Sequence, residues 1–314
     1  MLLISVISKN YVFRSQKAFC DIGFIMAPTV SMRPGDTIGF WGPPSSTINW
    51  CETNYEVTQY IAEFWNTITN LGFIIPPLFG LSNCRNLGIE SRYAYSFILI
   101  LLVGIGSWMF HMTLTFEMQL LDEIPMMWCG SYIVYCLYRS RSTHLTTQAK
   151  IVGILLSSHC LIGTILYVSN KNPIFFQVMF GIVVSSGVVL SIYHNYNYYS
   201  PLGLKLSVLA VTFTLIGFLC WNIDNLYCSQ VTSLRERIFR ANGSLKYLSP
   251  ITQLHGWWHI FAGFATYAQI LSCIQHRLRF LNIKHSVETT WTGIFIRMEV
   301  INEKAEFKSS LHHE

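Results

Sequence analysis

The chain has 314 residues, of which 52% are hydrophobic, 15% aromatic and only 12% charged. Soluble domains carry about 25% charged residues. The formal net charge is +5, but the basic residues do not form a continuous run of the kind that binds nucleic acid. The composition therefore excludes a disordered chain and a nucleic-acid-binding module, and it argues against a soluble globular protein.

Seven continuous apolar segments have the length that a bilayer requires of a helix, roughly 17–25 residues. They are residues 60–81, 97–114, 120–138, 151–168, 174–193, 206–227 and 256–274. Every Lys and Arg lies outside these segments, as expected where a cation would be costly in hydrocarbon. Because the apolar runs are continuous and do not alternate with polar residues, the predicted fold is an all-α membrane bundle of seven transmembrane helices.

Basic residues in the short connections predict the orientation of the bundle. The first-to-second connection contains Arg85 and Arg92, and the third-to-fourth contains three basic residues. The second-to-third connection contains none, and the fourth-to-fifth contains only Lys171. This bias predicts a lumenal or extracellular N-terminus and a cytosolic C-terminus, although four basic residues between the sixth and seventh segments argue for the opposite.

The chain divides into three predicted regions. Residues 1–39 are expected to be a poorly ordered extension, residues 40–280 the membrane domain, and residues 281–314 a cytosolic tail. The apolar start of the chain is followed by Lys9, Arg14 and Lys17, which makes it a poor signal peptide. Met26 is an alternative start.

Ionisable side chains of several predicted helices lie at the same membrane face, the lumenal one. They are Glu63, His111, Asp122, Glu123, Asp224, His255 and His259. An ionisable residue within a membrane segment is a candidate functional residue by default. Their shared depth makes a common site the favoured interpretation.

Three of these residues have the pattern of a metal site. His255 and His259 are four residues apart, so both imidazoles lie on one helical face, and His111 is a third candidate ligand. Three histidines with an open fourth position are typical of catalytic zinc, whose bound water becomes a nucleophile near neutral pH. Asp122 is placed to act as a general base and Ser107 to stabilise an oxyanion. The structural alternatives are a Ser107 bond to its i−4 carbonyl and an Asp122 helix cap.

A second polar cluster precedes the first predicted span and comprises Asn49, Glu52 and Asn54, followed by Glu63. Such oxygen ligands suit calcium, but spacing alone favours an ordinary helix cap. Cys51 and Cys228 both fall just outside predicted spans on the lumenal side. They can form a disulfide in an oxidising compartment, with Cys20 as a competing partner.

The longer motifs resemble those of the alkaline ceramidases, most closely the alkaline phytoceramidase branch. The matching stretches are Trp41-Gly-Pro-Pro, Asn49-Trp-Cys-Glu, Tyr60-Ile-Ala-Glu-Phe-Trp-Asn-Thr, Gly106-Ser-Trp-Met-Phe-His-Met-Thr-Leu, Glu117-Met-Gln-Leu-Leu-Asp-Glu, Trp221-Asn-Ile-Asp-Asn and His255-Gly-Trp-Trp-His. The resemblance extends from about Phe40 to about Lys284. It implies a seven-helix amidase of the endoplasmic reticulum or Golgi that cleaves ceramides to a sphingoid base and a fatty acid.

The resemblance also implies residue roles. Zinc would be held by His111, His255 and His259, with Ser107 and Asp122 catalytic. Calcium, structural or regulatory, would be held by Asn49, the Trp50 carbonyl, Glu52, Asn54 and Glu63. Cys51 and Cys228 would form the disulfide. One departure is Asn49, where the family pattern has Asp, so that one negative charge is lost and weaker calcium binding is expected.

The function predicted from these observations is zinc-dependent hydrolysis of the ceramide amide bond within the membrane. The alternative is a seven-helix lipid receptor or lipid-binding protein with a non-catalytic zinc site. The pair of Ser107 and Asp122 favours the enzyme, because a receptor needs no base beside its metal. A proton-relay transporter is disfavoured because the sequence has no repeat-related broken helices.

Overall fold

The computed structural model describes residues 36–240, 243–289 and 296–301. Most of the predicted N-terminal extension, together with Cys20 and Met26, lies outside the described residues. The last part of the predicted tail, from residue 302, lies outside them too.

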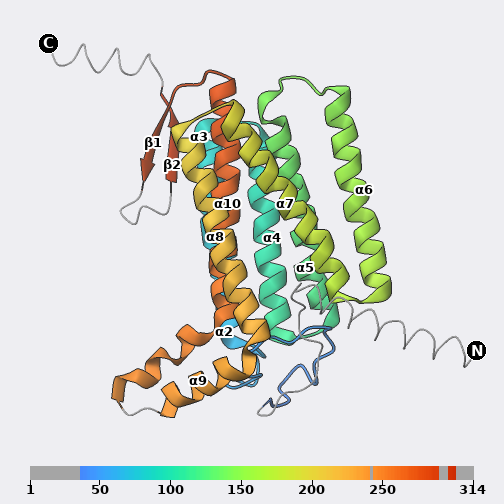
Figure 1. Cartoon of the computed structure of the whole chain (residues 1–314), viewed down its shortest axis with the longest axis vertical. Coiled ribbons are helices and arrows are strands. Elements are labelled where there is room, and N and C mark those ends of the chain that lie inside the picture. Colours follow the sequence, from blue (N-terminus) through green and yellow to red (C-terminus); the bar gives the residue numbers. More distant parts are fainter. Residues whose placement is uncertain (1–35, 241–242, 290–295, 302–314) are drawn as a thin grey trace, which may run out of the picture.

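The described chain is mostly helical, and long helices pack side by side in a bundle (Figure 1). The long helices are α3 (Leu71–Leu87), α4 (Ser91–Thr113), α5 (Phe116–Tyr138), α6 (Thr147–Asn170), α7 (Pro173–Asn197), α8 (Pro201–Leu226) and α10 (Leu254–Phe280). By length and composition, α4, α6, α7 and α8 can cross a membrane. The predicted integral membrane protein is therefore supported by these four helices. The remaining long helices carry more polar residues or, in α3, span only 17 residues.

Local sequence signals determine where several helices begin. Thr146 caps α6 by accepting a hydrogen bond from the backbone of Ala149. Asn172 and Ser200 cap α7 and α8 in the same way, and each is followed by a proline at the first helical position. A proline there loses no helical hydrogen bond, and its fixed φ suits the first turn.

The first predicted span begins later than the hydropathy indicates. Residues 60–63 are not helical, and the short helix α2 (Phe64–Thr69) is separated from α3 by Asn70. The preceding segment, from residue 36, is irregular and hydrogen-bonds to the end of α4. The backbone N–H of Glu63 donates to the carbonyl of His111 at 2.9 Å, and that of Ser46 donates to the carbonyl of Leu114 at 3.1 Å.

Short elements close the two ends of the bundle (Figure 1). The irregular segment, α2 and α9 (Cys228–Arg240) lie at one end, and η2 (Gly243–Thr252) connects α9 to α10. At the other end, η1 (Arg139–Arg141) follows α5. There β1 (His285–Thr289) pairs antiparallel with β2 (Ile296–Val300).

This β-hairpin was not predicted from the sequence. Met298 is fully buried, and Ile296 belongs to the same apolar core as residues of α3 and α10. The side chain of Asn83 in α3 substitutes for a neighbouring strand: its amide N–H donates to the carbonyl of Ile296 at 2.6 Å, and its oxygen accepts from the N–H of Met298 at 3.1 Å.

Two glycines bring α3 and α10 into direct backbone contact near the end of the bundle that carries α2 and α9, which we call the polar end. A Cβ atom added to Gly72 would lie 2.8 Å from the Cα of Ile260. One added to Gly263 would overlap the carbonyl of Gly72. Since the obstacles are backbone atoms, the helices would have to move apart.

We therefore expect Gly263→Ala to lower the thermal unfolding midpoint in detergent, with a loss of about 1–3 kcal/mol, because overpacking forces a backbone shift. Gly181→Ala in α7 is the matched control, since an added Cβ there has no atom of another helix within 4 Å. Equal midpoints for the two variants would contradict this account of the α3–α10 contact.

Candidate metal centre

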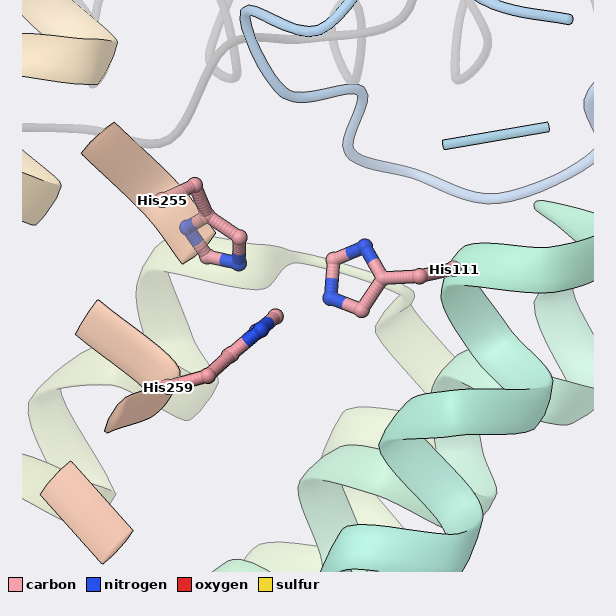
Figure 2. A group of neighbouring side chains, drawn as sticks. All are labelled: His111, His255 and His259. Atoms are coloured by element: carbon pink, nitrogen blue, oxygen red, sulfur yellow. The ribbon is translucent and has the colours of Figure 1, made fainter. Parts of the chain in front are cut away.

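Three buried histidines converge at the polar end of the bundle (Figure 2). His111 lies in the last turn of α4, and His255 and His259 lie one turn apart at the start of α10. The ring centroids are 4.6–5.1 Å apart, and one nitrogen of each ring lies within 4.8 Å of the other two. The sequence prediction that these three side chains meet is therefore confirmed.

The hydrogen bonding of these rings fits a metal site. Among the described residues, neither Nε2 of His111 nor Nδ1 of His255 has a hydrogen-bond partner, although both atoms are buried. A buried polar atom without a partner is costly, and a metal ion is the partner that converging neutral imidazoles suit best. The triad has the donors and the spacing to hold a metal ion.

Two of the three rings are oriented through their other nitrogen. Nδ1 of His111 lies 2.6 Å from Oε2 of the fully buried Glu63. Nδ1 of His259 lies 3.1 Å from the hydroxyl of Thr69. That hydroxyl donates its only proton to the carbonyl of Trp65 or Asn66, so it accepts from His259. Partners of this kind fix both the ring orientation and the nitrogen that faces a metal.

Ser107 and Asp122 lie together between α4 and α5. Both are buried, and the Asp122 carboxylate lies near the Ser107 side chain where α4 and α5 pack against each other. The contact depends on Gly106, because a Cβ there would overlap the carbonyl of Leu121. The alternative role of Asp122 as a helix cap is wrong, since α5 begins at Phe116 and Asp122 lies inside it.

The neighbouring acid, Glu123, hydrogen-bonds residues other than those around Asp122. Its Oε2 accepts hydrogen bonds from the Tyr167 hydroxyl and, at 3.0 Å, from the Gln119 amide. The same amide also lies 2.9 Å from the Tyr167 hydroxyl. Glu123 therefore ties α5 to α6 and is not one of the residues that face the histidines.

The predicted calcium residues are brought together by the irregular segment. Glu52 accepts hydrogen bonds from the N–H groups of Trp65 and Asn66 at 2.7 and 2.8 Å, so it caps α2. Burial, followed by the charge of Glu63, raises the pKa of Glu52 to about 8. The amide oxygen and nitrogen of Asn54 are buried without a hydrogen-bond partner in the described part of the chain. Two buried carboxylates beside buried amide oxygens are a donor set that suits a hard cation.

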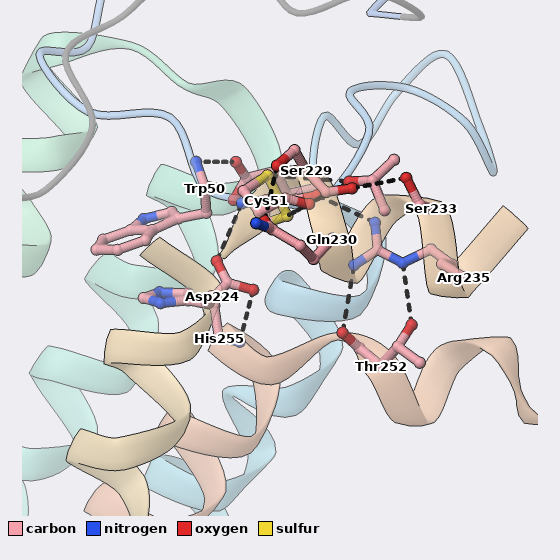
Figure 3. Close-up of a disulfide and its surroundings, with 12 residues drawn as sticks. Trp50, Cys51, Asp224, Ser229, Gln230, Ser233, Arg235, Thr252 and His255 are labelled. Carbon is pink, nitrogen blue, oxygen red and sulfur yellow. Dashed lines mark hydrogen bonds between the residues drawn. A yellow bond between two sulfur atoms is a disulfide. The ribbon is translucent and has the colours of Figure 1, made fainter. Parts of the chain in front are cut away.

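Cys51 and Cys228 are joined in the structure, with their Cα atoms 5.4 Å apart (Figure 3). The bond ties the irregular segment to the first residue of α9. The competing partner Cys20 lies outside the described residues. A link between segments 177 residues apart in sequence strongly restricts the unfolded chain.

The fold and the site together define a helical membrane protein with a buried three-histidine cluster that could hold a metal ion. Comparison with known proteins identifies the family. The model of the Ceramidase family matches residues 42–301, and the chain belongs to this family of hydrolases.

Several named relatives match over most of their length. Alkaline ceramidase 3 of Mus musculus is 40% identical over 263 residues, covering 84% of this chain and 94% of the mouse protein. Alkaline ceramidase YPC1 of Saccharomyces cerevisiae is 33% identical over 269 residues, covering 81% and 83%. An alkaline ceramidase of Arabidopsis thaliana is 30% identical over 233 residues, covering 73% and 82%.

The hydrogen bond between Thr69 and His259 can be tested without an assay of activity. We expect Thr69→Val, which keeps the shape but removes the acceptor, to weaken metal binding about tenfold. Thr69→Ser should bind metal like the wild type. Competition with a chromophoric chelator measures the affinity, and equal affinities of the Val and Ser variants would show that the hydroxyl does not orient His259.

Proposed function

We propose that the protein is a zinc-dependent amidase that cleaves the amide bond of ceramides within the membrane. The observation that carries the proposal is the buried triad, in which Nε2 of His111 and Nδ1 of His255 have no hydrogen-bond partner among the described residues. Ser107 lies one turn before His111 on α4, and the buried Asp122 lies on the neighbouring helix α5. Family membership supports the ceramide substrate, because the named relatives are alkaline ceramidases.

His111, His255 and His259 would hold the zinc ion. When bound, zinc polarises a carbonyl and lowers the pKa of a coordinated water to about 7. Asp122 takes a proton from the attacking water and returns it to the nitrogen of the leaving sphingoid base, which departs as a neutral amine. Ser107, with its hydroxyl directed at the substrate, stabilises the negative charge that develops on the carbonyl oxygen.

We also propose a calcium site in the irregular segment, built from Asn49, the Trp50 carbonyl, Glu52, Asn54 and Glu63. Its support is the concentration of buried carboxylate and amide oxygens beside the α2 cap. Because Glu63 also binds His111, bound calcium would stabilise the loop beside the metal centre. It would not activate the nucleophile, so its role is structural or regulatory.

The membrane arrangement completes the proposal. All seven long helices would span the bilayer, with the N-terminus and the metal centre on the lumenal side and the C-terminus in the cytosol. The compartment would be the endoplasmic reticulum or Golgi, where an oxidising lumen permits the bond between Cys51 and Cys228. Within the family, the motifs would place the chain closest to the alkaline phytoceramidase branch.

Two variants distinguish the proposed enzyme from the rival function, which is a receptor that binds zinc and lipid without turnover. We expect His255→Ala to lose both zinc and ceramide hydrolysis. Asp122→Asn should keep zinc but lose about 10²–10⁴-fold in kcat, the usual contribution of a general base. Fatty-acid release and bound zinc are measured on the purified protein in detergent.

The matched control for Asp122→Asn is Glu117→Gln, which makes the same change at an exposed position of α5. It should leave kcat unchanged. A wild-type protein that binds zinc but hydrolyses no ceramide species would establish the receptor function instead.

The calcium proposal predicts the effect of restoring the missing charge. We expect Asn49→Asp to bind calcium more tightly, because a third carboxylate joins Glu52 and Glu63 at the loop. The calcium-dependent rise in the thermal unfolding midpoint should then saturate at lower calcium. Asn197→Asp, at the exposed end of α7, is the control, and an unchanged calcium midpoint in Asn49→Asp would contradict the site.

A further inference from the structure

The third histidine of the triad is held differently from the other two. His111 and His259 are oriented by hydrogen bonds that their rings donate to Glu63 and Thr69, but Nδ1 of His255 is buried without a hydrogen-bond partner among the described residues. Its imidazole instead stacks on the indole of Trp50, with the ring centroids 3.7 Å apart and the planes 14° from parallel. A stacked ring fixes the plane of the imidazole while leaving Nδ1 without a hydrogen bond.

The backbone at His255 also needs an external partner. His255 is the second residue of α10, where the first N–H groups have no acceptor within the helix. The N-cap residue, Gln253, makes no side-chain cap hydrogen bond. The cap is supplied by another helix, because Oδ1 of Asp224, in the last turn of α8, accepts from the N–H of His255 at 3.3 Å. A buried carboxylate at this position also suits the positive end of the helix dipole.

The second oxygen of Asp224 holds the segment that carries Trp50 (Figure 3). Its Oδ2 accepts from the N–H of Cys51 at 3.0 Å. One carboxylate thus fixes the backbone of His255 and the backbone next to Trp50. The side-chain rings of these two residues stack on each other.

Arg235 of α9 holds the same segment from the opposite side. Its NH1 donates to the carbonyl of Cys51 at 3.0 Å, and its other nitrogens donate to Thr252, two residues before α10. Cys51 is therefore fixed at both its N–H and its carbonyl. This leaves Trp50 little freedom to move off the imidazole.

We propose that Asp224 is a positioning residue for the metal ligand His255, acting through the α10 cap and through the stacked indole of Trp50. The inference rests on the proposed metal centre, since it assigns how one ligand of that centre is oriented. In Asp224→Asn, an amide replaces a carboxylate that accepts from the N–H groups of Cys51 and His255. The amide has only one acceptor oxygen, so one of these N–H groups would face an NH₂ donor. The α10 cap, the Trp50 segment or both would therefore shift.

The test measures metal affinity and does not depend on ceramide turnover. Zinc is titrated against a chromophoric chelator at saturating calcium, so that the calcium proposed for the loop stays bound in every variant. We expect Asp224→Asn and Trp50→Leu each to lower zinc affinity about 10–100-fold, the usual effect of a partner that orients a ligand. Trp50→Phe should restore most of the affinity because it retains an aromatic ring.

Two further readouts separate positioning from general stability. In the cobalt-substituted protein, the visible spectrum should change in Asp224→Asn and Trp50→Leu but not in Trp50→Phe. The double variant Asp224→Asn/Trp50→Leu should lose less zinc affinity than the two single losses combined, because both substitutions act on the imidazole of His255. Thr146→Ala, which removes the cap of α6 far from the metal centre, should change neither the zinc affinity nor the cobalt spectrum.

Three outcomes would overturn the inference. The first is zinc affinity in Asp224→Asn within about twofold of wild type, even with a lower unfolding midpoint. The second, which decides the question if Asp224→Asn does not fold, is wild-type affinity in Trp50→Leu. The third is a wild-type protein that binds no zinc, which overturns the proposed function as well. The first two leave the proposed function intact.

Discussion

The polar end of the bundle depends on one buried carboxylate, that of Glu63. Its Oε2 lies 2.6 Å from His111 and accepts from the Asn66 side chain, while its Oε1 accepts from the N–H of Trp50. A buried carboxylate is tolerable only when its charge is compensated by such partners. The irregular segment, the start of α2 and the end of α4 must therefore all be in place together.

The same requirement explains why the polar residues cluster at one end. Along most of the bundle, the core consists of apolar residues such as Phe97, Leu271 and Ile274, which pack without directional bonds. At the end that holds the three histidines, charged and amide groups are enclosed by backbone N–H donors from α2 and by the side chains of α8 and α9. The irregular segment supplies acceptors and donors that a regular helix would have used internally.

Much of this arrangement was predictable from the sequence, and the reason is local periodicity. Apolar runs determine long helices, and a spacing of four residues places His255 and His259 on one face. The long-range parts were not predictable in the same way. Nothing in the sequence near Glu63 indicates that it pairs with His111, and Asp224 meets Cys51 across 173 residues. The hairpin was not predicted because each strand has only five residues and because β2 pairs with the buried Asn83 as well as with β1.

The hairpin makes the end of the chain part of the folded bundle. Asn83 sits in α3 with its amide satisfied by residues that lie more than 200 positions later in the sequence. During synthesis, these two hydrogen bonds cannot form until residues 296–298 have been made. This end of the bundle therefore closes late, after all the long helices have been synthesised.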